Sequence, residues 1–235
     1  MFGRTVSAPG VRRVELVNTF MRGVYGWMTA GLGVTAATAL AVASSETMLN
    51  LIFGNTLLLL VLFFGQIGLV LYLSARVSKL SASAATGLFL AYSALNGVTL
   101  SAILLVYAQS TIFNAFFTAA GMFAAMSIYG MTTKRDLTGM GQFMMMGLFG
   151  IIIAMIINMF LGSSAMDMMI SVIGVIIFTG LTAYDSQKLR YMGETMPMDD
   201  ATAVRRGTIL GALTLYLDFI NLFLFLLRLF GGSRD

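Results

Sequence analysis

The chain has 235 residues, a net charge of +4, 58% apolar residues and only 10% charged residues. Soluble globular proteins carry about 25% charged residues, so this composition excludes an ordinary soluble domain. The absence of cysteine and histidine also excludes disulfides, the usual zinc sites and serine–histidine catalysis. Without imidazole, a pH response near neutrality requires carboxyl groups in unusual surroundings or the chain amine.

Long apolar runs separated by short polar segments predict an all-α, polytopic membrane protein. Each run is close to the ~20 residues that a helix needs to cross a bilayer. We expect a tail over 1–23, a transmembrane domain over 24–230 and a second tail over 231–235. The longest loop is expected at about 190–207. In chain order, the seven predicted spans are 24–44, 51–74, 83–105, 111–131, 141–162, 168–189 and 208–230.

The basic residues lie almost entirely on one side of these spans. Cytoplasmic loops are enriched in Lys and Arg, so the N-terminus is predicted to be cytoplasmic and the C-terminus outside. Short basic loops of this kind indicate membrane orientation and give no reason to expect a nucleic-acid partner. Only Arg228 and Arg234 fall on the opposite side. The other twelve are Arg4, Arg12, Arg13, Arg22, Arg76, Lys79, Lys134, Arg135, Lys188, Arg190, Arg205 and Arg206.

Two acidic residues lie inside predicted spans. Asp185 is near the end of the sixth span, and Asp218 is about ten residues into the seventh. Because these two spans run in opposite directions, both carboxyl groups fall in the same half of the membrane. An ionisable group in a span is a candidate functional residue. The alternative is a structural hydrogen bond that fixes the register of the two helices.

Small and polar residues share a face with each of these acids. Thr182 precedes Asp185 by three residues, and Thr214 and Asn221 flank Asp218 at helical spacing. Such a stripe in an apolar helix is expected to face protein or a water-filled path. We therefore predict that Thr182, Thr214 and Asn221 line an ion pathway that includes Asp185 and Asp218.

Several segments of the chain resemble the Bax inhibitor-1 family, most closely its bacterial members. The resemblance covers nearly the whole chain beyond the N-terminal tail. Its longest motif lies in the seventh span. The segments that carry it are Val24-Tyr25-Gly26-Trp27-Met28, Tyr92-Ser93-Ala94-Leu95-Asn96-Gly97-Val98-Thr99-Leu100, Thr132-Thr133-Lys134-Arg135-Asp136-Leu137, Thr182-Ala183-Tyr184-Asp185 and Tyr216-Leu217-Asp218-Phe219-Ile220-Asn221-Leu222-Phe223, followed by Leu226-Leu227-Arg228.

The resemblance implies a fold in which the seventh helix is central and the other six surround it. It also implies a pH-sensitive calcium leak in the bacterial inner membrane, with Asp185 and Asp218 as the sensing dyad. A basic residue after the second helix is thought to engage this dyad in the family. Arg76 and Lys79 are both candidates for that latch. Some members carry a glutamate in the second helix, where this chain has Gln66.

Three functions remain open from the sequence. The first is a Ca²⁺ leak, in which Asp185 and Asp218 bind the transported ion weakly and transiently and no cofactor is needed. Two carboxyl groups in contact would share one proton, and the closed state would depend on that proton. The second is a non-conducting regulator that binds a membrane-anchored protease, a partner suggested by the family, or other membrane proteins. The third is an intramembrane aspartyl protease, which the missing Gly-x-Gly-Asp signature disfavours. We therefore expect no enzymatic activity.

Overall fold

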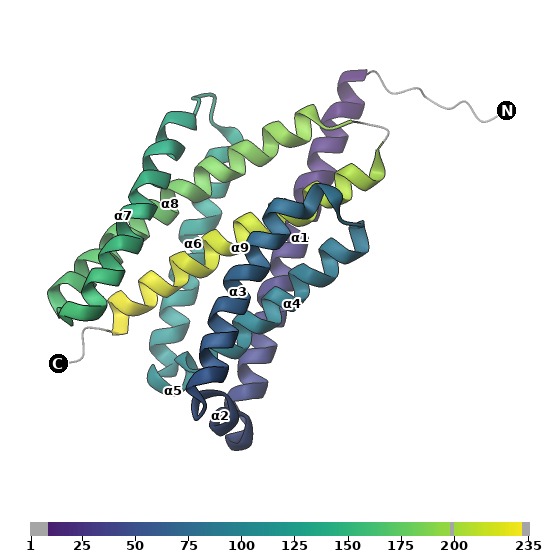
Figure 1. The fold of residues 1–235 in the computed structure, drawn as a ribbon. Helices are drawn as coiled ribbons and strands as arrows, with labels where there is room; N and C mark the ends of the chain where they lie inside the picture. Colours follow the sequence, from purple (N-terminus) through teal and green to yellow (C-terminus); the bar gives the residue numbers. More distant parts are fainter. Residues whose placement is uncertain (1–8, 198–199, 232–235) are drawn as a thin grey trace.

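A computed structural model describes residues 9–197 and 200–231, and within them the chain forms helices joined by short connections (Figure 1). Seven of these helices are long and apolar enough to cross a membrane. The spanning helices are α1 (Pro9–Ala43), α3 (Thr56–Arg76), α4 (Ala82–Leu100), α6 (Gln109–Thr132), α7 (Thr138–Leu161), α8 (Ser164–Thr195) and α9 (Ala201–Gly231). The shorter elements are α2 (Glu46–Phe53), the 3₁₀ turn η1 (Val77–Lys79) and α5 (Ile103–Val106).

Seven spanning helices in an all-α membrane protein are thus confirmed, but several helix ends differ from those predicted. Helix α1 begins at Pro9, within the expected tail 1–23. Helices α8 and α9 reduce the expected loop 190–207 to a short connection, since α8 continues through Thr195 and α9 begins at Ala201. An apolar window detects only the segment inside lipid, whereas backbone hydrogen bonds extend a helix into polar sequence. Residues 1–8, 198–199 and 232–235 lie outside the described part.

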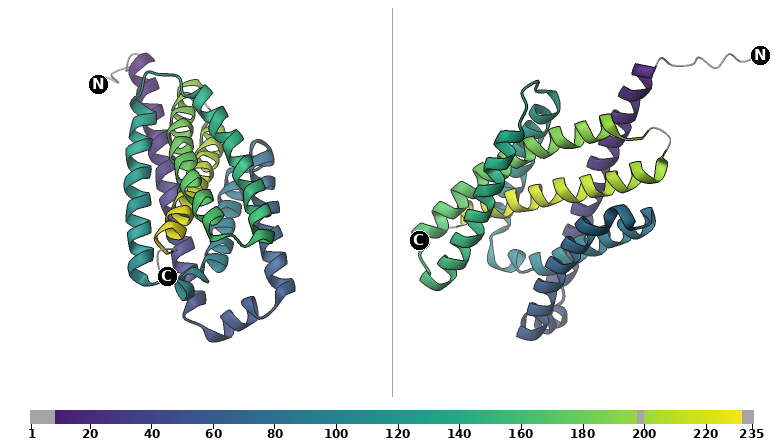
Figure 2. Two further views of the ribbon diagram at one scale, coloured as in Figure 1. Left: turned by 90° about the vertical axis from the view of Figure 1, so that its left-hand side faces the viewer. Right: turned by 45° about the horizontal axis from the view of Figure 1, so that its top comes forward.

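Helix α9 occupies the centre of the bundle, as predicted. It packs against α8, α1, α6 and α4 (Figure 2). Its Tyr216 is fully buried and meets Phe89 and Tyr92 of α4 edge to face. On other sides, Phe219 meets rings of α6 and Phe225 stacks on a ring of α8. Aromatic pairs of this kind add about 0.5–1.5 kcal/mol each beyond their buried area.

Glycine permits the closest helix contacts around α8. Gly130 of α6 lies directly against the backbone of Ala183, two residues before Asp185. Gly141 of α7 lies under the ring of Tyr184. Without a side chain at these two positions, α6 and α7 approach α8 more closely than any larger residue would allow. The backbone around Asp185 is therefore held from two sides.

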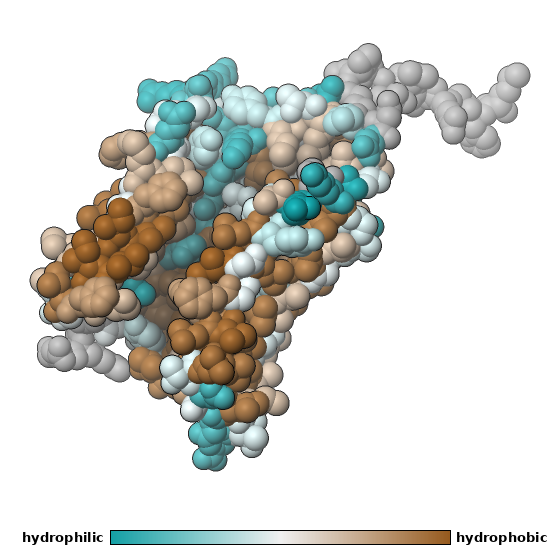
Figure 3. Space-filling model, viewed as in Figure 1, coloured by the Kyte–Doolittle hydropathy of each residue, from teal (hydrophilic) through white to brown (hydrophobic). Residues whose placement is uncertain are grey.

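The outer helices α3 and α7 carry the surface that faces lipid. Only 6% of the apolar window of each is buried. Their exposed side chains are mostly Leu, Ile, Phe and Met, and they form part of the apolar band in Figure 3. Helix α7 packs chiefly on α8, and α3 chiefly on α4. Hydrophilic residues gather at the end where α1 and α9 begin, which we call the basic end.

The contact at Gly130 can be tested by adding one methyl group. In Gly130→Ala, the new Cβ atom would collide with the carbonyl oxygen of Ala183, so α6 and α8 would have to separate. We expect a destabilisation of about 1–3 kcal/mol, as for other overpacked sites, measured as a lower Tm in detergent.

The matched control is Gly121→Ala on the same helix, where a Cβ atom meets nothing within 4 Å. Its Tm should stay the same or rise slightly, because alanine favours helix more than glycine does. Equal Tm values for the two variants would contradict the proposed contact.

Candidate functional site

Asp185 of α8 and Asp218 of α9 meet at the most deeply packed helix pair of the bundle. Asp185 is 9% exposed and Asp218 is 5% exposed. The two side chains lie close enough for their charges to influence each other. The sequence-based pairing of these two carboxyl groups thus agrees with the geometry.

The Asp218 carboxyl group lacks a hydrogen-bond donor for one of its oxygens. Its Oδ2 atom is buried and has no hydrogen-bond partner within the described residues. A buried acceptor without a donor costs about 1–3 kcal/mol, and a charged one costs more. A proton carried by one carboxyl group would provide a donor between them.

A cation other than the two latch candidates influences this pair, although its side chain is also exposed. Lys188, three residues after Asp185 on α8, lies within electrostatic reach of its carboxyl group. Arg76 and Lys79 are both exposed, and neither forms an ion pair in the described part of the chain. The turn η1 nevertheless packs against α9, so the segment that carries Lys79 touches the helix of Asp218.

The polar residues expected along the pathway are satisfied by their own helices. The hydroxyl groups of Thr182 and Thr214 donate to carbonyl oxygens one turn earlier, at 2.7 and 3.1 Å. The amide of Asn221 donates to the carbonyl of Leu217 at 2.8 Å. Thr182 is fully buried, whereas Thr214 and Asn221 are half-buried. Each residue still has a side-chain oxygen that can accept a hydrogen bond or coordinate a cation.

Gln66 does not approach the dyad. Its amide nitrogen donates to Thr99 and to the carbonyl of Leu95, both on α4. This residue therefore ties α3 to α4 within the apolar part of the bundle. The glutamine at this position acts as a structural link between two spans.

The dyad supplies only two acidic ligands to an ion. No group of three or more His, Cys, Asp or Glu side chains that could hold a metal occurs within the described residues. Ca²⁺ usually takes 6–8 oxygen ligands. An ion at Asp185 and Asp218 would therefore retain water or use hydroxyl and carbonyl oxygens from the same helices.

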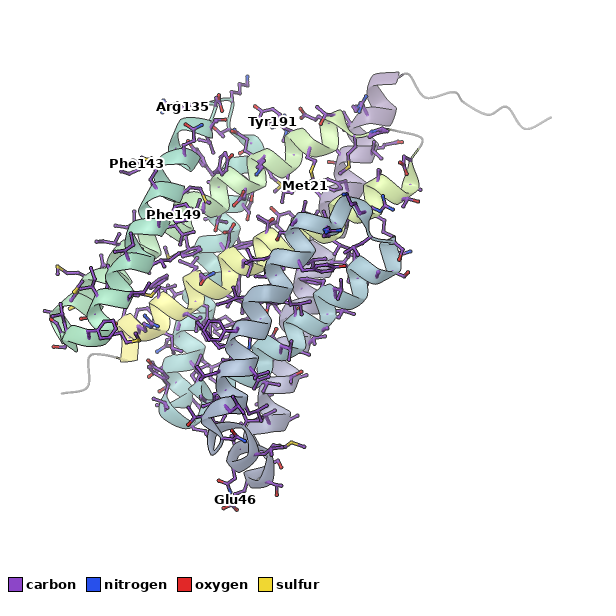
Figure 4. All side chains as sticks on the ribbon, in the orientation of Figure 1. Met21, Glu46, Arg135, Phe143, Phe149 and Tyr191 are labelled. Carbon is purple, nitrogen blue, oxygen red and sulfur yellow. The ribbon has the colours of Figure 1, made fainter. Side chains whose placement is uncertain are left out.

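Gln187 was not identified from the sequence, although it fixes the α6–α7 connection. It is 3% exposed. Its Oε1 accepts from the backbone of Leu137 at 2.9 Å, and its Nε2 donates to the carbonyl of Arg135 at 2.8 Å. The only sequence signal was a glutamine beside a span acid, which does not indicate its partner. Arg135 is labelled at this connection in Figure 4.

The same connection includes a charged turn. Asp136 accepts hydrogen bonds from the hydroxyl and the backbone N–H of Thr138, at 2.6 and 2.9 Å. These two hydrogen bonds hold the pKa of Asp136 below its ordinary value. The carboxylate therefore stays charged at neutral pH and organises the start of α7.

A second group of polar side chains lies beside the dyad. The hydroxyl of Tyr25 on α1 is 3.4 Å from the hydroxyl of Ser186, and Ser186 donates to Ser127 of α6 at 3.3 Å. Ser186 is the residue directly after Asp185. Helices α1, α6 and α8 are thus joined by polar contacts next to one of the two acids.

Comparison with known proteins identifies the family. The family model described as "Inhibitor of apoptosis-promoting Bax1" matches residues 17–235. The chain belongs to the Bax inhibitor-1 family. It is 52% identical over 218 residues to "Inner membrane protein YbhL" of Escherichia coli (strain K12), and 93% of each chain is covered. An uncharacterized protein of Borreliella burgdorferi is 46% identical over 224 residues, which cover 95% of this chain and 96% of that one. The family resemblance seen in the sequence is confirmed.

The role of Gln187 gives a testable prediction for this Bax inhibitor-1 member. Gln187→Leu would leave the buried N–H of Leu137 without its acceptor. Since an unpaired buried group costs about 1–3 kcal/mol, we expect a lower Tm. Hydrogen exchange at the start of α7 should also become faster.

Gln142→Leu is the control, because Gln142 is exposed on α7 close to the same connection. It should leave both Tm and exchange nearly unchanged. If Gln187→Leu behaves in the same way, the connection does not depend on this side chain.

Proposed function

We propose that this protein is a pH-sensitive leak pathway for Ca²⁺, in which Asp185 and Asp218 bind both the proton and the passing ion. The observation that supports this most strongly is the burial of two interacting carboxyl groups between α8 and α9. Ionisable groups are expensive inside a membrane protein and usually mark a pathway for ions or protons. Family membership supports the same function.

Weak binding of Ca²⁺ suits a transport pathway better than a storage site. Two carboxylates attract a divalent cation, but they provide too few ligands for a tight calcium site. An ion in a conducting pathway must also be able to leave. The half-buried oxygens of Thr214 and Asn221 on α9 offer additional weak contacts next to Asp218.

A shared proton provides the gate in this proposal. When one proton lies between the carboxyl groups, a short hydrogen bond holds α8 and α9 together. When the proton leaves, two negative charges repel each other and also attract a cation. The closed state is therefore favoured at lower pH and the open state at higher pH.

The orientation is part of the same proposal. The basic end carries almost all the Lys and Arg residues and is assigned to the cytoplasm by the positive-inside rule. The location is the bacterial inner membrane, in keeping with the name of the Escherichia coli relative. Asp185 and Asp218 then lie in the cytoplasmic half of the membrane.

The dyad can be tested by removing one charge at a time in proteoliposomes that report Ca²⁺ flux. Wild-type flux should increase from about pH 5 to about pH 8, as the shared proton is lost. In Asp185→Asn and in Asp218→Asn, the ratio of the flux at about pH 8 to the flux at about pH 5 should fall towards one. Each asparagine keeps the shape but removes the repulsion.

Asp167→Asn is the matched control on α8, since Asp167 is 53% exposed. It should keep the wild-type pH dependence. Wild-type protein with no flux above empty vesicles would reject the leak and favour a non-conducting regulator. Wild-type pH dependence in both dyad variants would place the sensor elsewhere.

The cation that influences the dyad can be identified by three further variants. Lys188→Gln should move the midpoint of the flux–pH curve to higher pH, because a nearby positive charge favours the ionised carboxyl group. Arg76→Gln and Lys79→Gln test the predicted latch in the same assay. The largest shift should occur for Lys188, and unchanged curves for Arg76 and Lys79 would exclude the latch.

A further inference from the structure

A cleft opens at the basic end between α1, α6 and α8. Its inner part has a volume of ≈ 590 Å³ and is lined by α1 residues including Asn18 and Tyr25, with Met131 of α6 and Arg190 of α8. A second hollow of ≈ 410 Å³ adjoins it and shares Val17, Asn18 and Arg190. Because three residues line both, we treat the two hollows as one cleft. Figure 4 labels Met21, on the α1 wall, and Tyr191, the residue after Arg190.

The charge of this cleft is positive. Arg22 lines the inner part, Arg13 lines the outer part, and Arg190 lies between them. Among the described residues, Glu194 is the only acidic residue that lines it, and it pairs with Arg190 at 3.0 Å. Two positive charges therefore remain in excess. This arrangement would repel a cation and attract an anion.

Two of these arginines are already held in place by backbone groups. Arg13 donates through Nη1 to the carbonyl of Met196 at 2.9 Å, and Arg190 donates through Nη1 to the carbonyl of Met131. A guanidinium has five N–H donors, so each retains donors for a ligand. Arg22 is exposed and makes no polar contact with another described residue. The donors are thus oriented, and several are still available.

The depth of the cleft matches the surface of a bilayer. Tyr129, two residues before Met131, and Tyr191, directly after Arg190, are 41% and 46% exposed. Tyrosine gathers where the headgroups of a membrane meet its apolar core. Val17, Met21 and Met131 make one side of the cleft apolar. A ligand here would therefore meet arginines and apolar side chains together.

We propose that this cleft binds the phosphate of an anionic glycerophospholipid, with Arg13, Arg22 and Arg190 around the phosphate and the apolar residues against the glycerol and upper acyl chain. Arginine matches phosphate geometry and charge well. Lipid binding here does not depend on ion transport, although Tyr25 in the cleft also contacts Ser186, the residue after Asp185. A free phosphate ion would use the same arginines but not the apolar side.

The proposal can be tested by native mass spectrometry of the full-length protein in detergent with added phosphatidylglycerol. Wild type should retain the lipid, and retention should fall about fivefold in Arg22→Gln, the effect expected from one basic residue near a phosphate. Asn18→Trp should reduce retention as well, because the indole fills the cleft without changing charge. Lys134→Gln removes an exposed charge at the same end outside the cleft, and it should retain the lipid as wild type does.

Two further measurements separate the sources of phosphate. Phosphatidylcholine should be retained less than phosphatidylglycerol, and excess inorganic phosphate should not displace the lipid. Equal retention in wild type, Arg22→Gln and Asn18→Trp would overturn the site. Equal retention of the two lipids, or displacement by inorganic phosphate, would overturn its assignment to an anionic lipid. Arg22→Gln keeps the test decisive if the tryptophan variant does not fold.

Discussion

The structure depends on keeping two carboxyl groups next to each other inside an apolar bundle. Removing a carboxylate from water costs several kcal/mol, and a second carboxylate nearby adds repulsion. The helices that carry Asp185 and Asp218 are also the two most buried of the seven spans, at 44% and 67% of their apolar windows. Packing elsewhere along α8 and α9 has to offset this local cost. In the proposed function, a proton or a divalent cation between the carboxyl groups would relieve this repulsion, and the two would compete for one place.

The surroundings of α8 restrict how that repulsion can be relieved. Gly130 brings α6 against the backbone at Ala183, and Gly141 brings α7 against the ring of Tyr184, both just before Asp185. Gln187 and Arg190 bind carbonyl groups at the end of α6 and in the α6–α7 connection. Helix α8 is therefore joined to α6 by a backbone contact at Gly130 and to the α6–α7 connection by side-chain hydrogen bonds to backbone groups. Helices α8 and α9 nevertheless pack extensively against each other, so any movement near the acids has to disrupt this interface.

The sequence was sufficient for the features that depend on hydrophobicity and chain direction. Seven apolar runs predicted the spans, and the opposite directions of the last two brought Asp185 and Asp218 to the same depth. The position of Lys188, about one helical turn after Asp185 and within electrostatic reach of its carboxyl group, was not predicted from the sequence. The assignment of a latch to Arg76 or Lys79 stays a prediction. The role of Gln187 depends on a backbone about fifty residues away in the chain, and no local pattern records such a partner. The helices predicted from the sequence were too short, because the thickness of the bilayer limits the apolar segment of a helix but not the total length of the helix.

Helix α7 is attached to the bundle chiefly through α8, and most of its surface faces lipid. If α8 moves away from α9, α7 has to move with it, and this pair then displaces lipid as it changes its tilt. The free-energy cost of fitting a helix to the bilayer thickness is a fraction of a kcal/mol per Å. A free energy of this size is enough to shift an opening equilibrium by a small factor. In the proposed function, acyl-chain length would thus act as a mechanical load on the same motion that the shared proton would control.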